Sequence, residues 1–219
     1  MRINRNQKTS KLDFRGLFFT AIDIYSRKLN VLIFNPLFLF ICFIKGVTVG
    51  KGTIFNGKPR IRRYYNSTIS LGSNCKFNSA KNSISVGIYH PCSFITLSKE
   101  AEITFGNNTG ATGLKIAARL RINIGDNVLI GANCVILDND FHHPNPYKRD
   151  DDNSAIPSKP IIIEDNVFIG INCTVLKGVT IGKNSVIGAN SVVYSDIPEN
   201  SIAIGNPCKV IMKKRLVQE

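Results

Sequence analysis

The chain has 219 residues, of which 28 are Lys or Arg, 15 are Asp or Glu and 17 are Gly. This length can build one domain with a sizeable core, and the ordinary glycine and charge content excludes collagen-like and disordered proteins. The formal net charge of +13 is unevenly distributed, because residues 1–63 carry 13 basic and two acidic side chains whereas residues 64–208 carry 11 and 12. The last eleven residues, 209–219, add four basic side chains and one acid.

Residues 1–45 form a basic, apolar N-terminal segment. Apolar side chains recur there at helical spacings of three and four, at Phe14, Leu17, Phe18, Ile22 and Tyr25. The apolar run Val31 to Ile44 is too short for a membrane span, and we expect Pro36 to interrupt it. Two functions stay open for the segment: a cap on the domain that follows, or attachment to an anionic membrane surface. Nucleic-acid binding is not expected, because no recognised motif is present.

The six cysteines are widely spaced and contain no C-x-x-C pair, which argues against a zinc ribbon or a disulfide framework. Buried free thiols are the better interpretation. The apolar run Val31 to Ile44 begins too late for a secretory signal and is followed by no small-residue cleavage site. We therefore expect a cytoplasmic protein, with a peripheral position on the inner face of the membrane if the N-terminal segment binds lipid.

A six-residue repeat organises most of the remaining chain. Apolar residues fall six apart at Ile163, Ile169, Val175, Ile181, Ile187 and Val193, and a second series begins two residues earlier at Ile161. The same series runs upstream through Ile122 and Val128, and a weaker form covers residues 46–102. This period fits neither an α-helix nor an amphipathic strand, but it fits a triangular coil of strand-plus-corner units. We expect the glycine after an inward residue to permit each sharp corner, and successive coils to pair as parallel strands of an all-β solenoid over residues 46–206.

The repeat stops at Ile136 and resumes at Ile161, so residues 137–160 must form a loop outside the solenoid. Long loops in compact domains are usually functional. This one contains His142 and His143 close to Asp138 and Asp140. Histidine can act as a general base near pH 7, and a carboxylate can orient its ring. From the residues alone, a solvated polar loop remains the alternative.

Three stretches, Ile122–Asn133, Ile163–Gly170 and Val179–Asn190, together with the closing run Asp196–Ile211, resemble the hexapeptide-repeat acyltransferases. The galactoside, maltose and surface-polysaccharide O-acetyltransferases are the most similar. The resemblance is strong over 103–212, weaker over 46–102 and absent from 1–45. It implies a left-handed parallel β-helix, with the helical segment before it and a short C-terminal tail at 207–219. It also implies a homotrimer with active sites at the subunit interfaces.

The resemblance implies roles for particular residues. The family has a catalytic histidine in an Asp-x-Asp-aromatic-His setting, which Asp138 to His142 match, with Pro146 and Arg149 at the expected distances. His142 is then the general base, Asp140 its catalytic neighbour and Asp138 an acceptor contact, while Arg149 braces the loop. His143 is a neighbour without an assigned role. The irregular stretch after Gly106 supplies two further acceptor contacts, Asn108 and Thr112.

The donor implied by the family is acetyl-CoA, lying in the groove between adjacent subunits. Gly170, Ala189 and Gly205 match small positions along that groove. Ser195 stands where many relatives have a lysine for a CoA phosphate, so Lys209, Lys213 or Lys214 would replace it. No ligand cluster in the sequence suggests a metal.

These features predict an acetyl-CoA-dependent O-acetyltransferase that modifies a sugar hydroxyl during surface polysaccharide biosynthesis, such as that of capsule, O-antigen or exopolysaccharide. Two alternatives stay open. One is an N-acetyltransferase acting on an aminosugar nucleotide, and the other is a catalytically silent solenoid that serves as a scaffold.

Overall fold

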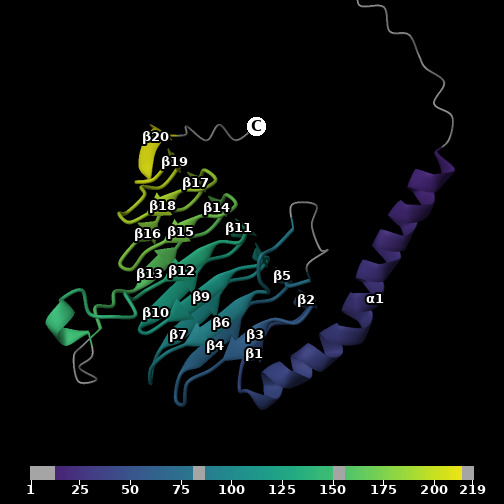
Figure 1. Cartoon of the computed structure of the whole chain (residues 1–219), viewed down its shortest axis with the longest axis horizontal. Helices are drawn as coiled ribbons and strands as arrows, with labels where there is room; N and C mark the ends of the chain where they lie inside the picture. Colours follow the sequence, from purple (N-terminus) through teal and green to yellow (C-terminus); the bar gives the residue numbers. More distant parts are fainter. Residues whose placement is uncertain (1–12, 81–86, 150–155, 214–219) are drawn as a thin grey trace, which may run out of the picture.

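The computed structural model describes residues 13–80, 87–149 and 156–213. One long helix, α1 (Phe14–Ile44), precedes short strands that wind into a left-handed parallel β-helix (Figure 1). Its three sheets are here named A, B and C, and each turn of the chain passes through them in that order. The β-helix expected from the six-residue repeat is thereby confirmed.

Up to β18, each sheet collects every third strand of the chain, and β19 and β20 then extend sheet B. Sheet A contains β1 (Thr48–Val49), β4 (Thr68–Leu71), β7 (Glu102–Phe105), β10 (Arg121–Ile124), β13 (Ile161–Ile163) and β16 (Thr180–Ile181). Sheet B contains β2 (Ile54–Asn56), β5 (Lys76–Asn78), β8 (Gly110–Thr112), β11 (Leu129–Ala132), β14 (Phe168–Ile169), β17 (Val186–Ile187), β19 (Ser201–Ile204) and β20 (Lys209–Lys213). Sheet C contains β3 (Arg60–Arg62), β6 (Ser93–Thr96), β9 (Lys115–Ala118), β12 (Val135–Leu137), β15 (Thr174–Val175) and β18 (Val192–Val193).

The core is a set of stacked apolar columns, one along each sheet. In sheet A, Ile122 pairs with Ile103 in the preceding coil and with Ile161 in the following one, and all three are fully buried. The register thus passes directly from Ile122 to Ile161, so the loop between them leaves the coils undisturbed. Because each coil contacts only its neighbours, the solenoid is stabilised by local stacking.

The corners depend on asparagine as well as glycine, which corrects one expectation from the sequence. Most of the non-glycine residues with left-handed backbone are asparagines at corners, such as Asn127 (φ 56°), because asparagine tolerates this conformation better than other side chains. The glycine that follows an inward residue has a different task. A Cβ on Gly170 would lie 2.6 Å from the backbone nitrogen of Ala189 in the next coil. Glycine there permits close approach of two coils, and it is not the residue that makes the turn.

The first coils have an aromatic core, which explains why the repeat is weak in their sequence. Phe77 lies between Phe55, Phe94 and Phe105, with ring centroids 5.1–5.6 Å apart. Large rings here replace the isoleucine and valine that mark the later coils. The coils are regular, although their side chains depart from the aliphatic pattern.

Helix α1 covers the open end of the first coil, which confirms the cap that was one of two expectations. The side-chain oxygen of Asn35 accepts a hydrogen bond of 2.9 Å from the backbone N–H of Phe55 in β2. Phe38 and Cys42 follow on the same face of α1 and are buried. The expected interruption at Pro36 is wrong, because the helix continues through it. Pro36 removes one intrahelical bond, and we attribute the persistence of the helix to the packing of this face on the solenoid.

The other end of the solenoid differs from the expected tail. Residues 209–213 form β20, which pairs antiparallel with β19 at the last position of sheet B. Gly205 leads into the turn between them with a φ of 111°, a conformation that side chains rarely adopt. Lys214 lies outside the described residues.

All six cysteines are free and buried, as expected from their spacing. Burial raises the pKa of the Cys75, Cys92 and Cys208 thiols, because a thiolate is poorly solvated inside the solenoid. These thiols are core side chains and are poorly suited to nucleophilic chemistry.

Candidate active site

The loop after β12 is fixed to the solenoid by Asp138, whose side chain is completely buried. Its two carboxylate oxygens accept hydrogen bonds of 2.7 Å from the backbone N–H groups of Arg119 and Leu120, at the corner of the preceding coil. The backbone carbonyl of Asp138 accepts a further bond from Lys159, where the loop returns. We expected this carboxylate to contact the acceptor substrate. In the structure both of its oxygens accept hydrogen bonds from backbone N–H groups, and Asp138 anchors the base of the loop.

A tight turn follows and presents His142. The side-chain oxygen of Asn139 accepts a bond of 2.9 Å from the backbone N–H of Phe141, which has a left-handed φ of 61°. This conformation is costly for a bulky residue, and such positions concentrate at functional sites. The next residue, His142, is exposed at the surface, where a substrate can reach its ring.

Asp140 forms an ion pair with Lys177, from the following coil. Both side chains are about one third exposed. Lys177 was missed by sequence reasoning, because it lies in an ordinary corner between β15 and β16, distant from the loop along the chain. Among the described residues, the Asp140 carboxylate forms its ion pair with Lys177 and makes no hydrogen bond to the His142 ring.

The rest of the described loop is held by local contacts. Nδ1 of His143 accepts a hydrogen bond of 3.0 Å from the backbone N–H of Asn145, so this histidine carries an internal loop contact. Asn145 also caps the short 3-10 helix η1 (Pro146–Lys148). The guanidinium of Arg149 donates to the carbonyl of Pro144, which is the bracing contact expected for it.

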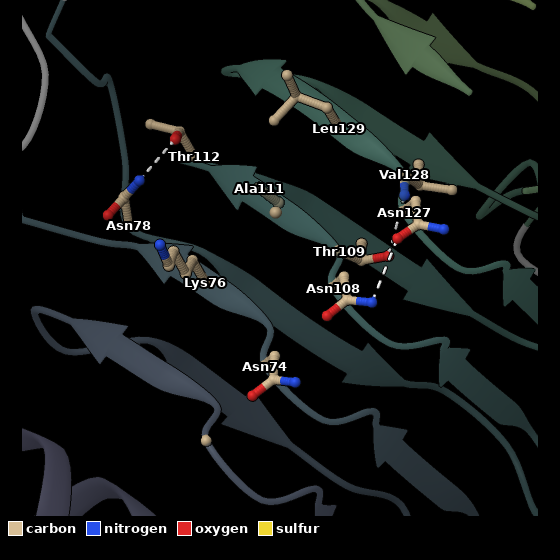
Figure 2. A pocket seen from close by; sticks show the side chains of 12 residues that line it. Asn74, Lys76, Asn78, Asn108, Thr109, Ala111, Thr112, Asn127, Val128 and Leu129 are labelled. Atoms are coloured by element: carbon tan, nitrogen blue, oxygen red, sulfur yellow. Dashed lines mark hydrogen bonds between the residues drawn. The ribbon is translucent and has the colours of Figure 1, made fainter. Parts of the chain in front are cut away.

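The two further predicted acceptor contacts lie on another side of the solenoid. Asn108 and Thr112 line a groove of about 630 Å³ on the outer face of sheet B, over β5, β8 and β11 (Figure 2). The Asn108 amide donates to Asn127 at 3.2 Å, and Thr112 accepts from Asn78 at 3.0 Å. The groove is rich in amide groups, which suits hydrogen bonding to hydroxyls.

The groove and the loop do not meet within one chain. The loop leaves between sheets C and A, whereas the groove lies on sheet B, and Figure 1 shows the loop and β11 on opposite sides of the solenoid. A second hollow, of about 340 Å³, lies at the base of the loop and is lined by Arg119, Arg121, Glu102 and Pro160 among others. The structure therefore brings Asp138, Asp140 and His142 together, and it places Asn108 and Thr112 elsewhere.

The predicted donor positions follow the corner between sheets B and C. Gly170 packs against Ala189 in the next coil, and the Gly205 N–H donates to Ser191 at 3.0 Å one coil further on. Lys209 begins β20 and is exposed beyond this corner. Lys213 ends the same strand, and its side chain lies outside the described part. Among the residues that the structure describes, no three His, Cys, Asp or Glu side chains are grouped to hold a metal ion.

Comparisons with known proteins agree with this architecture. The family described as the hexapeptide repeat of succinyl-transferase matches residues 121–136 and 160–195, on both sides of the loop. A galactoside O-acetyltransferase of Lactococcus lactis subsp. lactis (strain IL1403) is 46% identical over 92 residues, covering 42% of this chain and 43% of that protein. A protein of Staphylococcus aureus (strain COL), named as a candidate acetyltransferase, is 47% identical over 116 residues, covering 42% of this chain and 55% of that protein. The chain thus spans about half the length of the curated relatives it matches.

Among solved structures, the fold is shared with AntD, an N-acyltransferase from Bacillus cereus in complex with dTDP and 3-hydroxybutyryl-CoA. The TM-score is 0.58 at 20% identity, covering 77% of this chain and 83% of that one. The repeat, the left-handed β-helix and these matches confirm the resemblance found in the sequence: over residues 121–136 and 160–195 the chain is similar to the hexapeptide-repeat acyltransferases.

Proposed function

We propose that the protein is an acetyl-CoA-dependent O-acetyltransferase that modifies a sugar hydroxyl during surface polysaccharide biosynthesis. The observation that carries the proposal is the exposed His142, held on an anchored loop where the repeat is interrupted between β12 and β13. The 46% identity to a galactoside O-acetyltransferase over 92 residues favours oxygen as the nucleophile.

In the proposed reaction a ring nitrogen of His142 accepts the proton of the sugar hydroxyl. The hydroxyl oxygen attacks the thioester carbonyl of acetyl-CoA, so that a carbon–oxygen bond forms and the carbon–sulfur bond breaks. A backbone N–H would stabilise the oxyanion of the tetrahedral intermediate. The proton then passes from His142 to the departing sulfur, which gives the acetylated sugar and free CoA. Asp140 is proposed to support the imidazolium electrostatically, and Lys177 to hold that carboxylate in place.

The donor is proposed to lie along the corner marked by Gly170, Ala189 and Gly205, the small positions that the family resemblance assigns to the donor groove. Lys209 and Lys213 are proposed to meet the CoA phosphates. Both lie on the strand that closes this end of sheet B.

The activity is tested by following CoA release from acetyl-CoA with a panel of acceptors. We expect release with one or more hydroxyl sugars and none above background with matched aminosugar nucleotides. Turnover with the aminosugars alone would replace the proposal by the N-acetyltransferase. If no acceptor supports CoA release and the protein does not bind acetyl-CoA, the catalytically silent scaffold is the remaining alternative.

We further propose a homotrimer in which the loop of one subunit faces the sheet B groove of the next. The separation of His142 from Asn108 and Thr112 within one chain supports this arrangement. Two inactive variants, His142→Ala and a double Asn108→Ala, Thr112→Val variant, are expected to regain activity when mixed trimers are formed from them. If the mixed particles have a mass near three times 24.2 kDa but are as inactive as either parent, the active site is not shared between subunits. The homotrimer would still be supported by the mass.

A further inference from the structure

Helix α1 contacts the solenoid through only one face of its C-terminal part. Asn35, Phe38 and Cys42 lie on that face, and the contacts reach β1 and β2 in the first coil. Figure 1 shows the N-terminal part of α1 diverging from the solenoid. The helix is therefore a cap over a short stretch, and the residues that the structure describes leave most of its large apolar side chains exposed.

The uncovered surface of α1 is mostly apolar, with Arg15 and Lys28 as exposed charged residues on it. Leu32 is 74% exposed and Phe43 is 79% exposed, although both are strongly hydrophobic. Soluble proteins rarely expose contiguous apolar surface of this extent. The exposed large apolar side chains are Phe14, Leu17, Phe18, Phe19, Ile22, Ile24, Tyr25, Leu29, Leu32, Ile33, Phe34, Leu37, Leu39, Phe40, Phe43 and Ile44.

The dimensions of α1 suit a bilayer. Its 31 residues give a length of about 46 Å, and by length and composition it could cross a membrane. A signal sequence near the N-terminus can have the same composition. However, the part containing Asn35, Phe38 and Cys42 closes the first coil, so its removal would open the solenoid core.

The surface next to α1 is cationic. The sequence contains no Asp or Glu between Asp23 and Glu100. On the first coil Lys51, Lys58, Arg60 and Arg62 are all exposed. The two ion pairs recorded in the described residues lie far along the chain, at Asp140–Lys177 and Glu199–Lys183. The charge of this end is thus positive and uncompensated by nearby acids, which complements a surface of anionic phospholipid.

An apolar hollow lies between the exposed apolar surface of α1 and the cationic surface of the first coil. It has a volume of about 270 Å³ and lies between α1 and the first coil, lined by Phe34, Leu37 and Ile41 with Lys58 among its lining residues. An acyl chain in such a hollow would have its phosphate close to a cation.

We infer that α1 and the first coil form a membrane-binding surface, in which the exposed apolar side chains of α1 enter a bilayer and the first-coil cations contact anionic headgroups. This assigns the two expected roles of the N-terminal segment to different parts of one helix. The face around Phe38 caps the solenoid, and the remainder binds lipid.

The full chain is tested by flotation with vesicles of phosphatidylcholine alone, or with about one third phosphatidylglycerol. We expect flotation with the anionic vesicles. Placing a charge on the exposed face (Phe18→Glu with Leu32→Glu) should reduce the bound fraction at least about tenfold, because glutamate is costly in hydrocarbon. Tyr89→Glu changes a side chain that is 79% exposed on the solenoid and should float like the unaltered protein.

The cationic part has its own matched test. Neutralising two first-coil arginines (Arg60→Gln with Arg62→Gln) should lower binding to anionic vesicles by about 25-fold, at roughly fivefold for each charge. The same loss of charge further along the solenoid (Lys115→Gln with Lys183→Gln) should have little effect. If the protein floats with neither vesicle, and Leu32→Glu instead dissociates an oligomer in solution, a second copy covers α1 and the inference is overturned. Equal losses from both charge-neutralised variants would also overturn it, because attraction would then depend on net charge alone.

Discussion

Replacing His142 by alanine is expected to lower kcat by about 10²–10⁴-fold, the range typical for loss of a general base. The physical reason is that a sugar hydroxyl is a poor nucleophile at neutral pH unless a base removes its proton. Binding of acetyl-CoA should be unchanged, because the proposed donor positions lie at a different corner of the solenoid from the loop. The measurements are CoA release for the rate and calorimetry for donor binding.

His143→Ala is the matched control, since it removes the adjacent imidazole and its bond to Asn145. It should retain most of the activity. The two variants should unfold at the same temperature as the unaltered protein, because neither ring is part of the core. A His142→Ala enzyme with normal CoA release, or an equally inactive His143→Ala enzyme with normal stability, would contradict the assignment of the base.

Replacing Asp138 by alanine should lower the free energy of unfolding by about 2–3 kcal/mol, because a buried carboxylate is lost that accepts two backbone hydrogen bonds and one from the Asn139 side chain. The N–H groups of Arg119 and Leu120 would keep their positions in the coil without this acceptor. Urea unfolding measures the change. We expect a parallel fall in kcat, since Asp138 is where the loop begins.

Two variants show whether Asp138 acts through the fold. Asp138→Asn keeps one carbonyl oxygen as an acceptor and should recover part of the lost stability. Asp140→Ala removes a partly exposed ion pair and should cost no more than about 1 kcal/mol. If Asp138→Asn kept full stability and raised only the KM of the sugar, Asp138 would instead be the acceptor contact that its sequence motif suggested.

The later coils of the solenoid could be predicted from the sequence, because their inward side chains repeat at a regular spacing. Ile124, Ile130 and Ile136 occupy inward positions six residues apart, and all are buried. The early coils were harder to recognise, because Phe55 and Phe77 fill the same columns with rings. Likewise, the stacking role of Gly170 depends on Ala189, which lies in another coil and has no local signature.

The candidate site was predictable in outline because the loop residues are contiguous. Asp138, Asp140 and His142 lie within five residues, so one motif locates all three. Their partners are not local: Asp138 binds Arg119 and Leu120 in the coil before, and Asp140 pairs with Lys177 in the coil after. Such pairs depend on the stacking register, which a single sequence does not specify. The same limit applies to α1, since Asn35 meets Phe55 only after the first coil has formed.

The solenoid is closed at both of its ends, by α1 over the first coil and by the antiparallel β20 beside β19. A stack of parallel strands without such closure would present unpaired backbone groups that can template another molecule. Both closures therefore work against end-to-end polymerisation. A chain lacking either one would be prone to assemble into linear fibres, in which solenoids join through their exposed edges.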